Sequence, residues 1–165
     1  MLGRYYLFQS TNVMQLTENF SLAELTKSQM ATRLGFDNKP NQQHILSLKK
    51  LCENVLQPIR NRFEKPVIIS SGFRSAELNK AIGSSSKSQH CKGEAADIEI
   101  YGIDNKILAQ WIHNNTKYDQ LILEFYKESD PQSGWVHVSF TDKCRKQFLK
   151  AYKDQNGKTR YMPWQ

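Results

Sequence analysis

Two histidines and one aspartate have the residue types and the spacing of a metal site. His90 and Asp97 flank the start of a predicted strand, Ala95–Ile100, and His137 lies in another, Trp135–Phe140. Because successive side chains of a strand point to opposite faces, Asp97 and His137 lie opposite the apolar residues of their strands. Two imidazoles and one carboxylate on one sheet face, with a fourth position left to water, are typical of a catalytic zinc site.

A further carboxylate and an arginine add groups that hydrolysis of a peptide bond can use. Glu124 lies in a predicted strand, Gln120–Phe125, on the face opposite Phe125 and the other odd-numbered apolar residues. If this strand pairs with the one that holds His137, the two polar side chains project to the same side. A carboxylate that is not a ligand can take a proton from water and pass it to a leaving amine. Arg74 supplies a permanent cation for a substrate carboxylate or an oxyanion.

Each of these residues also has an ordinary structural explanation when it is taken alone. A buried histidine is commonly hydrogen-bonded, an aspartate caps a turn, a glutamate on a strand is solvated, and an arginine forms a surface ion pair. His44 and His113 lie on predicted helices without partners, and Cys91 is interpreted as a packing residue although it follows His90 directly. Spacing alone leaves both interpretations open.

Helices and strands alternate along the chain in an order that predicts an α+β fold. Capping residues and apolar periodicity predict a helix that begins at the Ser21–Glu24 capping box and further helices at Ser28–Leu34, Asn41–Phe63, Ser75–Ile82 and Asp104–Asn115. Alternating and β-branched runs predict strands at Val67–Ser70, Ala95–Ile100, Gln120–Phe125 and Trp135–Phe140.

Three of these elements carry more specific expectations. Pro58 should kink the helix Asn41–Phe63 or end it early, because proline cannot donate the helical hydrogen bond. The β-branched run Val67–Ser70 is typical of a buried strand. Ile107 is placed on the inner side of the helix that follows Asp104.

The composition limits the class of protein. The chain has 165 residues and a mass of 19.2 kDa, the size of one domain with one core. Its 39% hydrophobic residues are too many for a disordered chain, and no apolar run approaches the ~20 residues that cross a bilayer. Of the net charge of +7, most lies in residues 143–165, where seven Lys and Arg meet only Asp154. Such a segment can bind nucleic acid, an anionic membrane or an anionic cell wall, or it can simply be solvated.

The cysteines and the first residues indicate where the chain is made. Cys52, Cys91 and Cys144 follow no C-x-x-C spacing, so they indicate neither a disulfide framework nor a thiolate zinc site, and they fit a reducing compartment. The apolar run Tyr5–Phe8 is shorter than the core of a secretion signal. We therefore expect synthesis in the cytoplasm without a cleaved signal peptide.

The sequence around the candidate ligands resembles that of a known peptidase family. The zinc-binding motif of the zinc D-alanyl-D-alanine carboxypeptidases and related peptidoglycan peptidases is similar to Ser88-x-His90-x-x-Gly93-x-Ala95-x-Asp97, followed by Trp135-x-His137. The resemblance is greatest to the small phage and bacterial branch, which is endolysin-like. It extends from about Phe20 to Leu149 through matching segments that occur in the same order: Phe20–Leu25, Asn54–Arg60, Ser70–Ser75, Asp119–Phe125 and Gly134–Ser139.

The resemblance implies a fold, a metal and an activity. The fold is α+β and hedgehog/DD-peptidase-like, with a small antiparallel sheet flanked by helices. One zinc ion is held by His90, Asp97 and His137. Arg74 is then a catalytic and substrate-binding residue near the substrate carboxylate, and Ser88 is a substrate-binding residue close to the metal. The implied reaction is hydrolysis of peptide bonds in peptidoglycan stem peptides, by a carboxypeptidase or an endopeptidase.

The general base is the least regular part of the resemblance. Many relatives hold their catalytic glutamate a few residues before the last zinc histidine, where this chain has Pro131–Gly134. Glu124 lies about thirteen residues upstream and can fold back in a hairpin, so it is the favoured candidate. Glu128 and Asp130 on the intervening loop are alternatives. Trp135 stands where other relatives have a second histidine.

These observations predict three segments and one leading function. The segments are an N-terminal extension (1–19), a zinc DD-peptidase-like domain (20–149) and a loosely attached basic C-terminal tail (150–165). We expect a monomeric zinc peptidase that acts on the bacterial cell wall after release from the cytoplasm, or that is carried in a phage particle. The tail would be attracted to anionic wall polymers or lipid. The alternative is a non-catalytic wall-binding or virion structural module; nucleic-acid binding by the tail is a weaker hypothesis, and no specific nucleic acid is expected.

Overall fold

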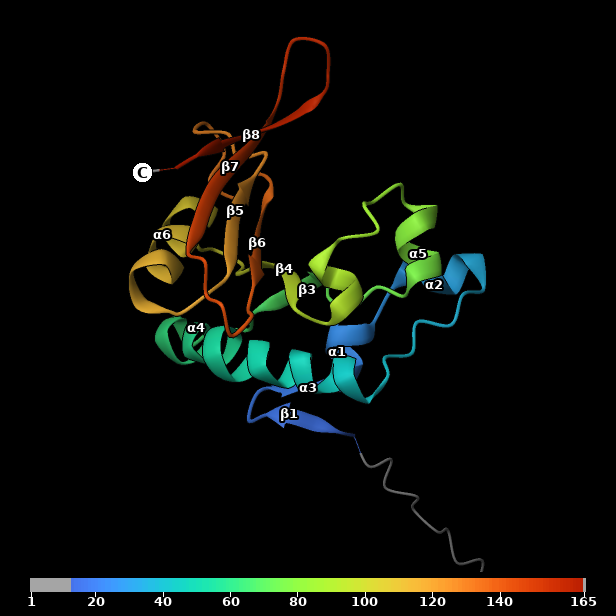
Figure 1. The fold of residues 1–165 in the computed structure, drawn as a ribbon. Coiled ribbons are helices and arrows are strands. Elements are labelled where there is room, and N and C mark those ends of the chain that lie inside the picture. Colours follow the sequence, from blue (N-terminus) through green and yellow to red (C-terminus); the bar gives the residue numbers. More distant parts are fainter. Residues whose placement is uncertain (1–12, 165) are drawn as a thin grey trace, which may run out of the picture.

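A six-stranded sheet is the centre of the fold (Figure 1). The structure is a computed structural model that describes residues 13–164, so the first part of the expected N-terminal extension lies outside the described residues. In spatial order the strands are β3 (Ile68–Ser71), β4 (Ala95–Glu99), β6 (Trp135–Ser139), β5 (Gln120–Glu124), β7 (Gln147–Lys153) and β8 (Thr159–Pro163). Neighbouring strands are antiparallel except β5 and β7, which are parallel. The α+β prediction is confirmed, and the sheet is larger and more mixed than expected.

One face of the sheet is covered by α3 (Gln42–Leu51), the π-helical η1 (Cys52–Leu56), α4 (Gln57–Phe63) and α6 (Asn105–Asn115), and the other is the open face. The remaining helices are α1 (Leu22–Thr26), α2 (Gln29–Leu34), α5 (Ala76–Ala81) and the 3-10 helix η2 (Gln89–Lys92), while β1 (Gln15–Thr17) and β2 (Phe20–Ser21) form a small separate sheet. The core consists of buried residues of α3, η1, α4 and α6 packed on alternate residues of the sheet: Leu48, Leu51, Val55, Ile59, Leu108, Ile112, Ala96, Ile98, Leu121, Leu123, Val136 and Val138. None of the helices within residues 13–164 is long and apolar enough to cross a membrane.

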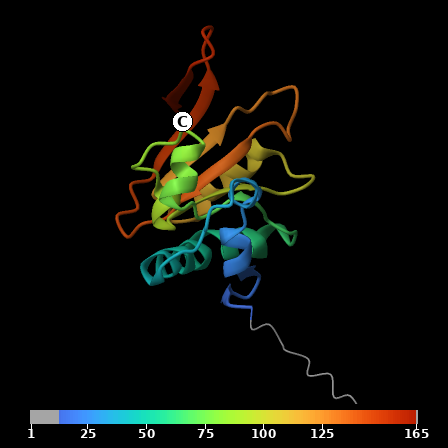
Figure 2. The same cartoon turned by 90° about the vertical axis from the view of Figure 1, so that its right-hand side faces the viewer.

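The predicted alternation of the strands is therefore confirmed on the core side. Ile98 and Val136 are fully buried against the helices, so the residues next to them in their strands, Asp97 and His137, emerge on the opposite face. Figure 2 shows α5 and the segment after it standing in front of that face. In Figure 1 this segment and the β7–β8 hairpin flank the open face from two sides.

The capping residues act as predicted at the N-terminal helices. Ser21 caps α1 and exchanges hydrogen bonds with Glu24: the Ser21 Oγ accepts from the Glu24 amide at 3.3 Å, and the Glu24 carboxylate accepts from the Ser21 amide at 2.9 Å. Ser28 caps α2, which ends at Gly35 with a φ of 68°. Leu25 of α1 places its backbone against Gly72, a contact that matters for the site below.

Pro58 does not end the long helix early. The chain stays helical from Gln42 to Phe63, but it passes through the π-helical turn η1 immediately before the proline. There the Gln57 amide bonds to the Cys52 carbonyl, five residues back, and Pro58 occupies the first turn of α4. A π-helical turn changes the hydrogen-bond register where proline has no N–H to give, so helix continues on both sides.

Three local predictions were wrong. β3 is an edge strand and is not buried, and Ile68 is 49% exposed, because no strand covers its outer side among the described residues. Ile107 is also exposed. Phe125 leaves the strand pattern because its φ is +53°, which ends β5 at Glu124 and turns the phenyl ring to the open face, where it lies 5.4 Å from the Trp135 ring.

Residues 150–165 were expected to be a loose basic tail, and this was also wrong. β7 pairs with β5 over five consecutive positions, from Gln147 opposite Gln120 to Ala151 opposite Glu124, and β8 pairs with β7. The segment thus adds two strands to the sheet. Alternation of apolar residues is weak here because β7 and β8 lie towards the edge, where lysine and arginine side chains remain solvated.

Candidate metal centre

Strand pairing brings the three candidate ligands together. β4 and β6 are antiparallel neighbours, and Asp97 lies directly opposite His137 in their register. His90 comes from η2, which ends at Gly93 in the left-handed conformation, and the chain then enters β4. A Cβ at Gly93 would lie 2.5 Å from the His44 carbonyl oxygen, so glycine is required for this close approach.

The ligand atoms converge on one point. Asp97 Oδ1 lies 3.0 Å from His137 Nδ1 and 3.4 Å from His90 Nε2, and the two imidazole nitrogens are 3.2 Å apart. A tetrahedral ion bound at about 2.0–2.1 Å holds its ligand atoms roughly 3.3 Å from one another. The spacing of this cluster therefore fits a metal ion held by His90, Asp97 and His137.

A backbone carbonyl orients the first ligand. His90 Nδ1 lies 2.8 Å from the Gly72 carbonyl oxygen, which can only accept, so the proton of the neutral ring is on Nδ1 and the lone pair of Nε2 faces the cluster. Gly72 in turn lies against α1, because the Phe73 amide donates to the Leu25 carbonyl at 2.7 Å. His90 is almost fully buried, which fixes the ring further.

We expect Gly72→Ala to weaken metal binding without changing a ligand. The new Cβ would lie 2.2 Å from the Leu25 carbonyl oxygen, so the backbone must shift and carry away the acceptor that holds His90. Loss of such a supporting hydrogen bond typically lowers metal affinity about 10–100-fold. Titration of metal-free protein with Zn²⁺ by calorimetry measures it, and Ser71→Ala serves as the neighbouring control; an unchanged affinity in Gly72→Ala would contradict this role.

Burial and hydrogen bonding keep the cluster in a form that can bind metal. Burial lowers the pKa of His90, which favours the neutral imidazole. Burial alone would raise the pKa of Asp97, but the adjoining His137 and His90 rings hold it well below its usual range. A neutral His90 imidazole beside an ionised Asp97 carboxylate is the state that a metal ion requires of these two groups.

Glu124 lies on the same face as the cluster. In the pairing of β5 with β6, Ile122 lies opposite His137 and Glu124 lies opposite Trp135, one step along the same face. Glu124 is buried, and this burial raises its pKa to about 7, with the negative charge of Asp97 adding to the effect and His137 opposing it. A carboxyl group with a pKa near neutrality can both accept and return a proton.

The two alternative acids lie elsewhere. Glu128 is bound to Lys106 at 2.9 Å on the exposed loop, and Asp130 forms the turn after Lys127. Of the acidic residues in the part of the chain that the structure describes, only Asp97 and Glu124 line the cleft. The geometry therefore favours Glu124 over both alternatives.

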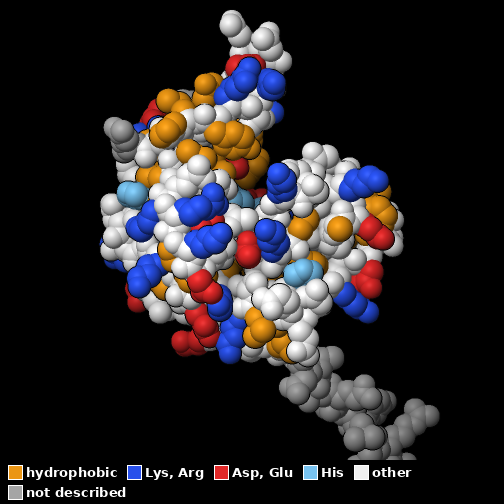
Figure 3. Space-filling view, in the orientation of Figure 1, with side chains coloured by type: hydrophobic (Ala, Val, Ile, Leu, Met, Phe, Trp, Pro, Cys, Tyr) orange, Lys and Arg blue, Asp and Glu red, His pale blue; other side chains and the backbone are white. Residues whose placement is uncertain are grey.

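Arg74 and Ser88 line the same cleft, which has a volume of about 710 Å³. Arg74 donates to Ser84 Oγ at 3.1 Å, while its buried Nε has no partner among residues 13–164. Ser88 caps η2 and accepts from the His90 amide at 3.3 Å, so it supports the ligand loop as well as lining the cleft. In Figure 3, histidine atoms are visible in the hollow near the middle of the molecule.

The comparison with protein families finds one matching family. The Peptidase M15 family matches residues 18–139, which include all six candidate site residues. The chain belongs to the peptidase M15 family. The resemblance to zinc D-alanyl-D-alanine carboxypeptidases is thereby confirmed at the level of the family. A comparison with curated proteins finds no match.

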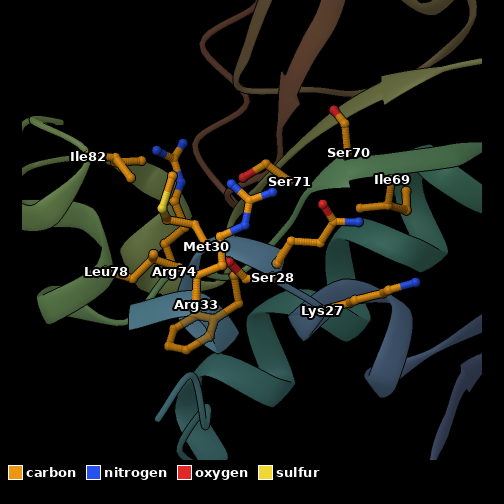
Figure 4. Close-up of a pocket in the computed structure, with 12 residues that line it drawn as sticks. Lys27, Ser28, Met30, Arg33, Ile69, Ser70, Ser71, Arg74, Leu78 and Ile82 are labelled. Carbon is orange, nitrogen blue, oxygen red and sulfur yellow. The ribbon is translucent and has the colours of Figure 1, made fainter. Parts of the chain in front are cut away.

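A second hollow of this M15 peptidase adjoins the first at Arg74 (Figure 4). It has a volume of about 520 Å³ and is lined by three cations: Lys27 just after α1, Arg33 on α2 and Arg74 in the loop after β3. Met30 and Ile82 give it an apolar wall. No acidic residue of the described chain lines this second hollow. Arg74 lies between the two hollows and lines both of them.

The sequence analysis missed the cleft residues that come from the last two strands. Leu149, Thr159 and Tyr161 line the cleft beside Glu124, and Arg145 lines it near the start of β7. The aromatic residues Tyr152, Tyr161 and Trp164 could have indicated that this segment is folded, but the sequence analysis placed them in a loose tail. His44 and His113 lie outside the cluster, as predicted: His44 caps α3, and His113 bonds to the Tyr118 hydroxyl at 2.7 Å.

Buried Asp119 connects the ligand loop of the M15 peptidase to this added region. Its carboxylate accepts from Gln89 Nε2 at 2.9 Å and from Arg145 Nη2 at 2.6 Å. Burial would raise the pKa of Asp119, but these hydrogen bonds hold it below its usual range. The residue before His90 is therefore tied to the segment that leads into β7.

The raised pKa of Glu124 predicts how the stability of the metal-free peptidase depends on pH. Below pH 4.5 the Glu124 carboxyl is protonated in both the folded and the unfolded chain, so it does not change the free energy of unfolding. Between pH 4.5 and about 7 the carboxyl ionises in the unfolded chain but stays protonated in the folded chain. The free energy of unfolding therefore falls as the pH rises through this range. Glu124→Gln should therefore be more stable than wild type at pH 8 and equally stable at pH 4. Urea denaturation with a chelator at both pH values measures this, and equal stability at pH 8 would contradict the raised pKa.

Proposed function

We propose that this peptidase is zinc-dependent and hydrolyses peptide bonds in the stem peptides of peptidoglycan. The observation that carries the proposal is the convergence of His90 Nε2, Asp97 Oδ1 and His137 Nδ1 beside Glu124, in a cleft whose other charged groups are cations. Two nitrogens and one oxygen are the donor set that zinc accepts while it keeps a position open.

The residues of the cleft divide the work of hydrolysis between them. Bound zinc would supply Lewis-acid chemistry, which activates water and polarises the scissile carbonyl. Glu124 is placed to take a proton from the attacking water and to give it to the leaving amine, because its buried carboxyl has a pKa of about 7. The buried half of the cleft lowers the local dielectric and strengthens these interactions.

Arg74 supports a substrate that carries carboxylates. Its guanidinium borders both hollows, and its Nε has hydrogen-bonding capacity that residues 13–164 do not use. A guanidinium binds a carboxylate by two parallel hydrogen bonds and stays charged at any pH of interest. Stem peptides of peptidoglycan carry several carboxylates, so Arg74 is placed to orient such a peptide, with Ser88 beside it.

The main competing function is a wall-binding or virion structural module without activity. It was motivated by the absence of a glutamate just before His137. Glu124 lies in the cleft on the same sheet face as His137, which favours the peptidase. The two functions differ in one product: a peptidase releases new amines from peptidoglycan, whereas a binding module releases none.

Digestion of purified sacculi tests the proposal. Zinc-loaded protein should release fragments with new amino groups, and mass spectrometry of the muropeptides identifies the bond that is cut. Activity should disappear with a chelator and return with Zn²⁺. Sacculi that remain intact across metals and pH values, although they bind the protein, would favour the binding module.

We further propose that the basic β7–β8 hairpin attracts the protein to the anionic wall on which it acts, after release or from a phage particle. Lys158 is exposed in the turn of the hairpin, and the ammonium group of half-buried Lys150 lies 4.5 Å from the centre of the Trp164 ring. Lys153 donates to Thr159 at 2.7 Å, and Arg160 is paired with Asp154 at 2.8 Å. Removing the hairpin by truncation after Leu149 would cut through β7 and disturb the sheet, so the attraction is better tested by substitution of single lysines. The pair Lys150→Ser and Lys158→Ser should weaken sedimentation with sacculi at low salt and have no effect at high salt. Equal sedimentation at both salt concentrations would contradict the attraction.

A further inference from the structure

Four strands place one row of side chains across the open face of the sheet. Trp135 on β6 lies opposite Glu124 on β5, Glu124 lies opposite Ala151 on β7, and Ala151 lies opposite Tyr161 on β8. Residues directly opposite each other point to the same face. Two strand spacings of about 4.8 Å separate the backbones of Glu124 and Tyr161, roughly 10 Å in all. The row therefore brings Tyr161 to the side of the base that is remote from Trp135.

The residue between them has a short side chain. Ala151 has the smallest side chain in the row, so no side chain at this position of β7 reaches between the carboxyl and the phenol. Lys153, two residues further along the same face of β7, lies with its ammonium group 5.3 Å from the centre of the Phe125 ring. Tyr161 and Glu124 line the same cleft, and Phe125 and Trp135 complete its aromatic end. In the next row Leu149 lies opposite Ile122, which lies opposite His137, so the hairpin also borders the metal ligands.

The Tyr161 side chain has an unused hydrogen-bonding group. It is 57% exposed, and its hydroxyl forms no hydrogen bond within residues 13–164. Burial of part of the ring raises the pKa of Tyr161, with the charge of Glu124 as the second cause, so the hydroxyl stays protonated and can donate. An exposed ring with a free donor beside a catalytic carboxyl is suited to hold a ligand.

We propose that the β7–β8 hairpin is the second wall of the substrate cleft and that Tyr161 donates a hydrogen bond to the stem peptide beside Glu124. This inference rests on the proposed function for the identity of the substrate. The match to the family covers residues 18–139 and so ends before β7 begins. Tyr161 is thus a substrate-binding residue that sets which peptides the cleft holds.

Two tyrosines of the hairpin provide a matched comparison. Tyr152 precedes Lys153 and lies opposite Arg160 in the same hairpin, so its side chain points to the face opposite that of Tyr161. Tyr161→Phe and Tyr152→Phe each remove one hydroxyl and retain the ring, so folding is preserved in both. The zinc content and the melting temperature of each variant verify this.

The experiment measures cleavage and binding of a synthetic muramyl pentapeptide separately. Tyr161→Phe should raise KM about three- to tenfold and leave kcat nearly unchanged, as expected for loss of one hydrogen bond to bound substrate. In proteins that also carry Glu124→Gln, calorimetry should show the same loss in Kd. Tyr152→Phe should behave as wild type in both assays.

The outcomes separate this inference from the proposed function. If the pentapeptide is cleaved and Tyr161→Phe has the KM and Kd of wild type, the inference is overturned and the proposed function stands. If the pentapeptide is bound but never cleaved, and Tyr161→Phe weakens binding, the inference stands and the proposed activity falls. If the wild type does not bind the pentapeptide at all, both are overturned.

Discussion

Glu124→Gln is expected to retain zinc and to lose at least about a hundredfold in kcat for muropeptide release. Glutamine keeps the size of the side chain and its place opposite Trp135, but it cannot take a proton from water or return one to the leaving amine. Because Glu124 is not among the three clustered ligands, metal binding should be unaffected. Rates of amine release from sacculi and zinc content by mass spectrometry measure the two effects together.

The control for this variant is Glu128→Gln, on the loop between β5 and β6. Glu128 binds Lys106 outside the cleft, so its loss should leave kcat unchanged. Full activity of Glu124→Gln would exclude Glu124 as the base. Inactivity of Glu128→Gln with zinc retained would show that the exposed loop moves into the cleft when substrate binds, which would also contradict the assignment.

His137→Ala is expected to abolish both zinc binding and activity. It removes one of three ligand atoms and leaves Asp97 without the hydrogen bond at 3.0 Å that keeps it ionised. Removal of a ligand should cost more than the about 10–100-fold in affinity that is typical for a residue supporting one. Since a metal that binds only the folded chain raises its melting temperature, Zn²⁺ should stabilise the wild type and not the variant.

His113→Gln is the matched control for this loss. His113 is bonded to Tyr118 on the other side of the sheet from the cluster, so this variant should bind zinc with the stoichiometry of wild type. A His137→Ala protein that keeps one tightly bound zinc ion and is stabilised by it would overturn the assignment of the metal centre.

Much of the candidate site could be predicted because it depends on local rules. Alternation along a strand is sufficient to place Asp97, Glu124 and His137 opposite the core, and the structure has all three there. The S-x-x-E spacing predicted the start of α1 because a capping box satisfies amides within one turn. What alternation could not provide is the strand order, which puts β4 beside β6 and so sets Asp97 against His137.

The errors arose where distant parts of the chain decide the conformation. β7 is stabilised by parallel pairing with β5, a contact that no pattern within the basic segment reveals. Phe125 follows the apolar alternation in the sequence, yet its positive φ sends the ring to the cleft. Gly134 packs directly against this turn, because a Cβ there would clash with the Glu124 carbonyl. The two ends of the β5–β6 connection are therefore in close contact at Phe125. Tyr161 was missed because it lies on β8, and the pairing that adds β7 and β8 to the sheet cannot be seen from the sequence of the basic segment.

The position of β8 at the end of the sheet also bears on how the protein behaves at high concentration. An edge strand presents free backbone N–H and C=O groups to which a strand of another molecule can add, and this is a common start of aggregation. β8 carries Arg160 and ends at Pro163, which has no N–H to offer. β3, at the other end, is only four residues long. Both edges are thus poor templates for a further strand, and the sheet resists edge-to-edge growth although six strands lie side by side.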